Sequence, residues 1–91
     1  MKFVYKKKFL KRFDLYPALI QELILETDLR IKTYLEKQIA PYGLRIKKIG
    51  PNTFEARITD KIRIVWVRKE DVIYFALLGT HDEVRRFIKN V

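Results

Sequence analysis

The chain contains no cysteine, so its 91 residues can form neither a disulfide framework nor a thiolate metal site. Small secreted domains usually depend on disulfides, which favours the cytoplasm as the compartment. No apolar run approaches the roughly 20 residues that a membrane span needs. The opening segment MKFVYKKKFLKRF mixes its lysines with the apolar positions, unlike a signal peptide. We therefore expect a cytoplasmic protein without a membrane-spanning segment.

Histidine is nearly absent too, since His81 is the only one. No Gly-rich phosphate loop, no metal-spaced set of histidines and cysteines and no nucleophile elbow is present. We therefore expect neither a metal nor a cofactor. What remains for chemistry is this one imidazole and a large set of cationic side chains.

Acidic residues are scarce relative to basic ones, and the chain carries a net charge of +9. Residues 1–13 hold six basic side chains and no acid, and residues 42–69 hold eight basic and two acidic ones. A segregated basic field attracts polyphosphates or acidic partners. This segregation favours a nucleic acid or an acidic protein as the partner over a lysine-rich surface that serves only solubility.

A length of 91 residues with 48% hydrophobic and 13% aromatic content suits one small packed domain covering residues 1–91. Residues 2–5 read as a short strand or as the start of a helix. Residues 9–13 have helical spacing. Pro17 opens the longest helical run, which continues to Ile39 unless Thr27 and Asp28 divide it into a helical hairpin. The predicted apolar stripe of this run comprises Ile20, Leu23, Ile24, Ile31, Tyr34, Leu35 and Ile39. The segment APYG at 40–43 ends it.

After Gly43 the apolar period changes to two. Strands are predicted at 44–49, 53–58, 62–67 and 72–78, with the last two apolar on both faces and hence covered on both sides. Thr80 and Glu83 form a capping box for a last helix with an apolar stripe at Val84, Phe87, Ile88 and Val91. The order predicts an α+β fold, in which an N-terminal strand and a helix or helix pair pack on one face of a mainly antiparallel sheet, followed by a short C-terminal helix.

Strand parity places Glu55 and Arg57 on one face of their strand, and Arg63 on a face of the next. Across a turn near 59–61, Arg57 and Arg63 can lie side by side, depending on the register. Two adjacent arginines repel unless an anion or a carboxylate lies between them. Glu55 can be that carboxylate, or the arginines can hold a phosphate through bidentate donors. The residues alone leave both interpretations open.

His81 follows the strand at 72–78 and precedes the last helix. A histidine near a helix N-terminus is often an ordinary exposed residue. The partial positive charge there disfavours the imidazolium, however, and favours a neutral base. Its position allows it to reach the rim of the sheet face that carries the arginines.

The segment GLRIKKIGPNTFEARITDKIRIVWVRKEDVIYFALLGTHDEVRRF, residues 43–87, resembles the C-terminal half of the RelE/ParE toxin superfamily, especially its RelE/YoeB/YafQ-like members. The resemblance lies in three short elements in order: Phe54 to Arg57, the "yRi" strand at Ile62-Arg63-Ile64, and Gly79 to Val84. The N-terminal helical half matches only in outline. Each motif is short, so the specificity comes from their order and spacing.

The resemblance implies a toxin of a type II toxin-antitoxin system, bound by a cognate antitoxin through an acidic or amphipathic segment. It implies helices on one sheet face and a basic concave surface on the other. Such toxins enter the ribosomal A site and cleave mRNA without a metal, by attack of the ribose 2′-OH on the adjacent phosphate. The alternatives are a ParE-like gyrase-poisoning toxin without RNase activity and a non-toxic basic RNA-binding domain.

By motif position, the implied catalytic residues are Arg57 and Arg63 as phosphate clamp, His81 as acid or as base, and Glu55 as the alternative base. Neither His81 nor Arg63 is expected to belong to the core. Many relatives carry a tyrosine where this chain has Arg85, which cannot titrate near neutral pH. Arg85 is itself a predicted RNA contact. The other predicted RNA contacts are Lys6, Lys7, Lys8, Lys47, Lys48 and Lys61.

Overall fold

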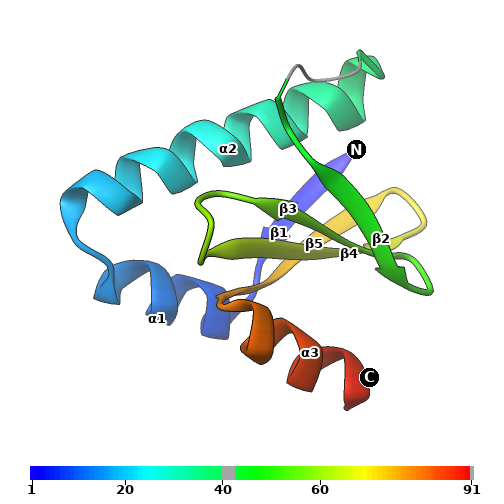
Figure 1. Cartoon of the computed structure of the whole chain (residues 1–91). Helices are drawn as coiled ribbons and strands as arrows, with labels where there is room; N and C mark the ends of the chain where they lie inside the picture. The colour runs from blue at the N-terminus through cyan, green and yellow to red at the C-terminus, as the bar shows by residue number, and fades with distance from the viewer. Residues whose placement is uncertain (40–42, 91) are drawn as a thin grey trace.

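The computed structural model describes residues 1–39 and 43–90. The chain runs from a short strand through two helices into four consecutive strands and a last helix (Figure 1). The elements are β1 (Lys2–Tyr5), α1 (Lys7–Leu15), α2 (Ala18–Lys37), β2 (Ile46–Gly50), β3 (Thr53–Arg57), β4 (Arg63–Lys69), β5 (Val72–Gly79) and α3 (His81–Lys89).

The five strands form one sheet in the order β1-β5-β4-β3-β2. The strands β2 to β5 pair antiparallel as a meander, because each is joined to the next by a short turn. The N-terminal β1 adds to the far side of β5 in parallel, with Tyr5 opposite Phe75. The predicted α+β fold with a mainly antiparallel sheet is therefore confirmed, and residues 2–5 form a strand.

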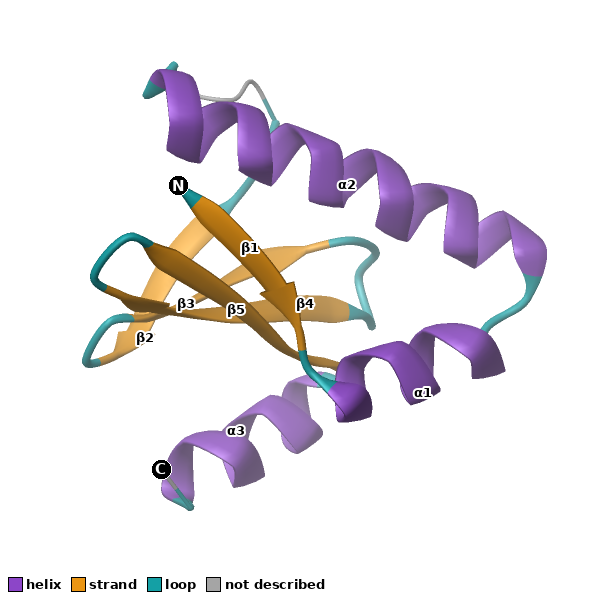
Figure 2. Ribbon diagram, turned by 180° about the vertical axis from the view of Figure 1, so that it is seen from behind, coloured by secondary structure: helices purple, strands orange, loops and turns teal. Residues whose placement is uncertain are grey.

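The sheet is covered on both faces (Figure 2). The α1–α2 face carries the larger core, centred on Ile64, Trp66 and Phe75 together with residues of both helices. On the other face, Val65 and Leu77 pack against Val84 of α3. This confirms that β4 and β5 are central strands apolar on both sides. The face on which the resemblance implies a basic concave surface is partly occupied by α3.

The helical half breaks at Tyr16 and Pro17, and α2 runs without interruption through Thr27 and Asp28. Both residues are buried against the sheet side of α2. Both carboxylate oxygens of Asp28 accept a hydrogen bond from the Tyr5 hydroxyl, at 2.7 and 2.8 Å. Lys32, one turn on, lies 3.1 Å from Asp28. Asp28 thus fastens α2 to β1, and of the two alternatives that the sequence left open for this run, the undivided helix is the correct one.

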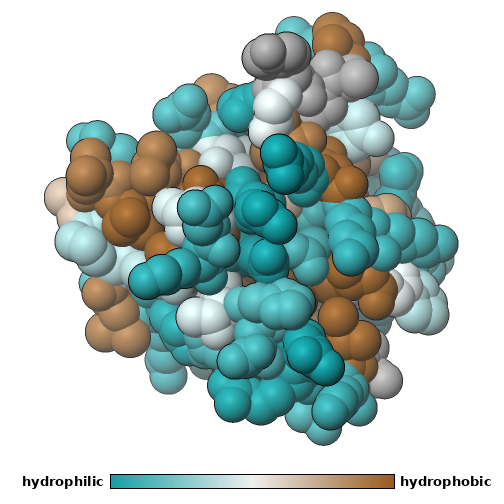
Figure 3. Space-filling view, viewed as in Figure 1, coloured by the Kyte–Doolittle hydropathy of each residue, from teal (hydrophilic) through white to brown (hydrophobic). Residues whose placement is uncertain are grey.

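The predicted apolar stripe of α2 is only partly correct. Ile24 and Ile31 are buried, whereas Leu23 is 36% exposed and Ile39, beyond the helix, is 62% exposed. Several leucines lie outside the core altogether, and apolar side chains gather where α1 meets α2 (Figure 3). The most exposed are Leu15, Leu19, Leu25 and Leu29. This corner is an apolar surface on an otherwise strongly cationic protein.

The capping box predicted for the last helix is confirmed. The Glu83 backbone N–H donates to the Thr80 hydroxyl, and the Thr80 backbone N–H donates to the Glu83 carboxylate. Of the predicted breaker at 40–43, only Gly43 is among the described residues, and the last stripe position at 91 also lies outside them. In the described part of the chain, no helix is long and apolar enough to cross a membrane.

Candidate functional site

The β3–β4 hairpin sets Arg57 directly opposite Arg63. The turn between them is held by the Thr59 hydroxyl, which accepts the backbone N–H groups of Lys61 and Ile62 at 3.2 and 3.0 Å. On its other side, Arg63 pairs with Gly79 at the end of β5. The register therefore brings the two arginines together on the sheet face that α3 partly covers, as the sequence allowed.

The two arginines differ in their surroundings. Arg63 Nε lies 3.1 Å from Glu55 Oε2, and these side chains are only 11% and 14% exposed. The buried Nε donates no hydrogen bond within the described part of the chain, so the contact is an ion pair without hydrogen-bond alignment. Arg57 is exposed and has no ion-pair partner among residues 1–39 and 43–90.

The sequence left two interpretations open, in which either Glu55 compensates the arginines or the arginines hold a phosphate, and each applies to one arginine. The carboxylate compensates Arg63, which lowers the repulsion between two guanidinium groups on paired positions. Arg57 remains uncompensated and available to an anion from solvent. The expectation that Arg63 lies outside the core is wrong in part, because its side chain is largely buried with Glu55.

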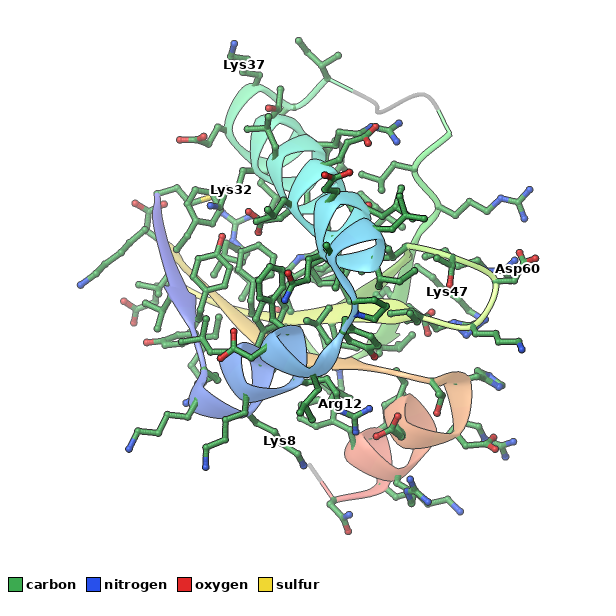
Figure 4. All side chains as sticks on the ribbon, turned by 90° about the vertical axis from the view of Figure 1, so that its left-hand side faces the viewer. Lys8, Arg12, Lys32, Lys37, Lys47 and Asp60 are labelled. Carbon is green, nitrogen blue, oxygen red and sulfur yellow. The ribbon has the colours of Figure 1, made fainter. Side chains whose placement is uncertain are left out.

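Lys47 extends this charged row, since it is opposite Glu55 across β2 and β3. Lys48 pairs with Phe54, whose side chain packs against the core on the α1–α2 face. Strand alternation therefore separates the two lysines, and only Lys47 lies on the face of the arginines. Lys61 is exposed in the β3–β4 turn, beside Asp60 at its tip (Figure 4).

His81 is the first residue of α3 and is exposed. His81 follows Gly79, the strand partner of Arg63, by two residues. The helix α3 therefore begins at the same end of the sheet as the arginine pair. Among the described residues, no hydrogen bond or ion pair joins the imidazole to either arginine or to an acid. Arg85 is exposed one turn further along α3.

The N-terminal lysines form a separate group beside the middle of β5, where the chain leaves β1. Lys6 precedes α1, and its backbone N–H donates to Phe75 O at 3.0 Å. Its ammonium lies 5.4 Å from the centre of the Tyr74 ring. Lys7 and Lys8 are exposed in the first turn of α1. The packing of α3 on Val65 and Leu77 separates this group from the arginine pair.

An ion pair that the sequence did not reveal fixes the start of α3. Arg12 reaches from α1 to α3, where both of its terminal nitrogens donate to the two carboxylate oxygens of Glu83 (Figure 4). The same carboxylate accepts the backbone N–H of Thr80 at 3.0 Å. The two residues are 71 positions apart in sequence. The capping box pointed to Glu83, but no local pattern pointed to Arg12.

Gly79 completes this arrangement. A β-carbon at this position would lie 3.1 Å from both Glu83 Cβ and Glu83 Oε1. Glu83 has little freedom to retreat, because Arg12 and Thr80 hold its carboxylate. The close approach therefore favours glycine between β5 and α3, because a side chain at this position would push against Glu83.

Acid should weaken this junction. The Arg12 guanidinium and, less strongly, the Thr80 backbone N–H lower the pKa of Glu83 from 4.5 to about 2, although burial of the carboxylate acts in the opposite direction. A lowered carboxyl pKa contributes stability above the unfolded value, and that stability is lost as the pH falls from about 4.5 to about 2. Because the pair is partly solvated, we expect Glu83→Gln to cost about 1–2 kcal/mol near pH 6 and much less near pH 2.

Urea unfolding at both pH values measures this difference. Glu22→Gln is the matched control, since Glu22 is an exposed glutamate on α2 with no ion pair in the described part of the chain. An equal loss for Glu83→Gln at both pH values would contradict the assigned role of the charge.

Comparison with known proteins identifies the fold. No protein-family profile matches the sequence, and no curated protein matches it significantly. Among solved structures, the chain is similar to the RelB-RelE antitoxin-toxin complex from Methanococcus jannaschii, with a TM-score of 0.67 and 22% identity, over 92% of this chain and 96% of that one.

Two further structures show the same likeness. The YoeB/ParE toxin from Agrobacterium tumefaciens has a TM-score of 0.66 and 19% identity, over 89% of this chain and 99% of that one. YafQ from E. coli has a TM-score of 0.60 and 15% identity, over 91% and 96%. Similarity of this extent over nearly the whole of each chain, at such low identity, establishes a shared fold.

Proposed function

We propose that this chain, which has the RelE/ParE-like toxin fold, is the toxin of a type II toxin-antitoxin system and cleaves mRNA on the ribosome. The observation that carries the proposal is the pairing of Arg57 with Arg63 at the end of the sheet from which His81 begins α3. Two guanidinium groups and an imidazole are the groups that metal-independent phosphodiester cleavage needs.

An antitoxin partner is part of this proposal. One of the structural neighbours is an antitoxin-toxin complex, RelB-RelE, and another is the DinJ-YafQ complex. The net charge of +9 suits an acidic protein as well as RNA. With the ribosome as its target and an antitoxin as its partner, the proposed toxin acts in the cytoplasm.

In the proposed reaction, a base removes the proton of the ribose 2′-OH, and the oxygen attacks the adjacent phosphorus. The bond from phosphorus to the 5′-oxygen breaks, and an acid protonates that oxygen. The products are a 2′,3′-cyclic phosphate and a free 5′-OH. Negative charge accumulates on the phosphoryl oxygens during the attack, where cationic donors stabilise it most.

We assign these catalytic tasks to individual side chains from their exposure and their ion pairs. Arg57 is exposed and uncompensated, so we assign it to the phosphoryl oxygens, with Arg63 beside it. His81 is assigned the proton transfer to the leaving oxygen, or from the 2′-OH if it is neutral. Glu55 is the alternative base, but its carboxylate lies 3.1 Å from Arg63 and must share or leave that ion pair to accept a proton.

Ribosomal RNA contacts need charge more than geometry. Lys47 and Lys61 are exposed near the arginines, and Arg85 is exposed on α3. Lys48 lies on the opposite sheet face, and the N-terminal lysines lie across α3. If all of them contact RNA, the ribosome must surround the protein on several sides.

Expression of the chain in bacteria, followed by mapping of new RNA 5′ ends, tests the proposal. We expect growth arrest and new ends within translated messages, while the purified protein barely cuts naked RNA because the ribosome completes the site. Growth arrest with DNA-damage signalling and intact messages would mark a gyrase poison instead. Growth without arrest would leave only a basic binding domain, and efficient cleavage of free RNA would indicate another nuclease class.

A further inference from the structure

The helix that begins with His81 has a small apolar footing on the sheet. It packs on Val65 and Leu77, with Val84 as its buried residue. Apolar contacts are non-directional, so they keep α3 on the sheet but oppose its rotation or a shift along its axis only weakly. The position of His81 along the sheet therefore depends on a further contact that has a direction.

The ion pair between Arg12 and Glu83 supplies that direction. Arg12 points from α1 toward α3, where one terminal nitrogen lies 3.0 Å from Glu83 Oε1 and the other donates to Oε2 (Figure 4). Among residues 1–39 and 43–90, it is the one polar side-chain contact between α3 and another element. A planar guanidinium bound to both oxygens restrains the orientation of the carboxylate as well as its distance.

Arg12 is itself firmly held, because α1 is anchored in the core. Phe9, one turn before Arg12, is only 3% exposed. Its ring lies 5.4 Å from that of Tyr5 and 5.9 Å from that of Phe75, between the centres. The guanidinium therefore transmits the position of the core to the first turn of α3.

The Glu83 carboxylate is in turn tied to the residues around His81. It accepts the Thr80 backbone N–H at 3.0 Å, and the Thr80 hydroxyl accepts the Glu83 N–H at 3.3 Å. The same side chain lies against Gly79, the strand partner of Arg63. One carboxylate thus joins α1, the end of β5 and the first turn of α3, so its position sets the distance from His81 to Arg63.

The imidazole, by contrast, is free to meet a ligand. His81 is exposed, and its ring makes no hydrogen bond or ion pair within the described part of the chain. Its reach is therefore set by its backbone, which the capping box encloses. A displacement of about 1 Å at a reacting group can lower a rate about 100-fold. The contact that fixes this backbone accordingly controls how well His81 meets a scissile phosphate.

We propose that Arg12 is a positioning residue of the candidate site, which acts through Glu83 to hold the first turn of α3, and with it His81, against the arginine pair. In this role Arg12 touches no substrate. The inference rests on the proposed function for the reaction, whereas the restraint on α3 is measured on the purified chain without ribosomes.

Amide hydrogen exchange tests the restraint. Arg12→Ala should speed exchange about tenfold at Thr80, Glu83 and Val84, whose N–H groups donate within the first turn of α3. Exchange in the central strands β4 and β5 should stay unchanged. Because the chain has one histidine, its imidazole C–H signals are assigned without ambiguity, and their NMR relaxation should show increased motion in the variant.

Cleavage of mRNA on purified ribosomes tests the consequence for the reaction. Arg12→Ala should lower kcat about 10- to 100-fold and leave KM within about threefold, because Arg12 is engaged with Glu83 and contributes little to RNA binding. Arg12→Lys keeps the charge but loses the bidentate geometry, so it should regain most of the stability and only part of kcat. A purely stabilising ion pair would restore both together.

Two control variants separate positioning from stability and from charge. Ile31→Val lowers stability at a fully buried position on α2, and Lys11→Ala removes an exposed charge next to Arg12. Both should keep kcat within about twofold of the wild-type value. Unchanged exchange or full kcat in Arg12→Ala would overturn the proposal. So would an equal loss of kcat in Ile31→Val, since stability alone would then explain it.

The two arms also distinguish this inference from the proposed function. A wild-type chain without ribosome-dependent cleavage would overturn the proposed function and the catalytic part of the inference. Faster exchange in Arg12→Ala would still support the restraint of α3 by Arg12. Cleavage by the wild-type chain together with full kcat in Arg12→Ala would overturn the inference and leave the proposed function intact.

Discussion

Replacement of His81 by glutamine should lower ribosome-dependent mRNA cleavage by a factor of about 10²–10⁴, the contribution that a positioned acid or base makes. Histidine is the side chain that exchanges protons near neutral pH without a perturbed environment, and this chain has one. Arg85 cannot take over the proton, because its guanidinium stays charged. Toxicity on expression should disappear with the cleavage.

The same substitution should leave the fold intact. His81 is exposed, and the capping box that starts α3 is made by Thr80 and Glu83. The free energy of unfolding should therefore stay within about 0.5 kcal/mol of the wild-type value. Cleavage on purified ribosomes and urea unfolding measure the two effects. Full cleavage by a folded His81→Gln protein would remove the catalytic assignment.

Arginine variants separate catalysis from stability at the same site. Arg57→Ala tests catalysis without a loss of stability, because Arg57 is exposed and unpaired in the described part of the chain. Arg63→Ala confounds the two effects. It leaves the Glu55 carboxylate largely buried without its partner, and an unpaired buried charge is destabilising. Loss of activity in Arg63→Ala alone therefore carries no information about the phosphate.

Replacement of Phe75 by alanine should destabilise the chain by about 3–5 kcal/mol, a large part of the 5–15 kcal/mol of a typical domain. Phe75 is fully buried at the centre of the α1–α2 face. Its ring stacks on Tyr5 at 4.9 Å and contacts Phe9 and Trp66 at 5.9 and 6.4 Å. Truncation removes these aromatic contacts and leaves a cavity between β1, β5 and α1.

Urea unfolding of Phe75→Ala measures this loss, and Leu19→Ala is the control. Leu19 is 70% exposed on α2, so its truncation should change the stability by less than about 0.5 kcal/mol. A loss below about 1 kcal/mol for Phe75→Ala would mean that the aromatic cluster does not organise the core.

The strands, the last helix and the α+β class followed from the sequence because their signals are local. A period of two marks β3, a continuous apolar run marks β4, and the Thr80–Glu83 capping box needs only three residues of spacing. The break before Pro17 also followed from the sequence, whereas the continuity of α2 through Thr27 and Asp28 stayed open, because Asp28 looks like a helix breaker. Its burial against Tyr5, 23 residues away, is a tertiary contact that no local pattern contains.

For the candidate site, the residue types and their spacing already showed which groups are available: one imidazole, a pair of arginines on neighbouring strands and few acids. The register of the sheet decided that Arg57 faces Arg63, and the packing decided that Glu55 compensates only Arg63. Only the tertiary structure brought Arg12 to Glu83. The residue type can be read at each position of the sequence. Charge pairing depends on distances in space, which the separation of two residues along the chain does not determine.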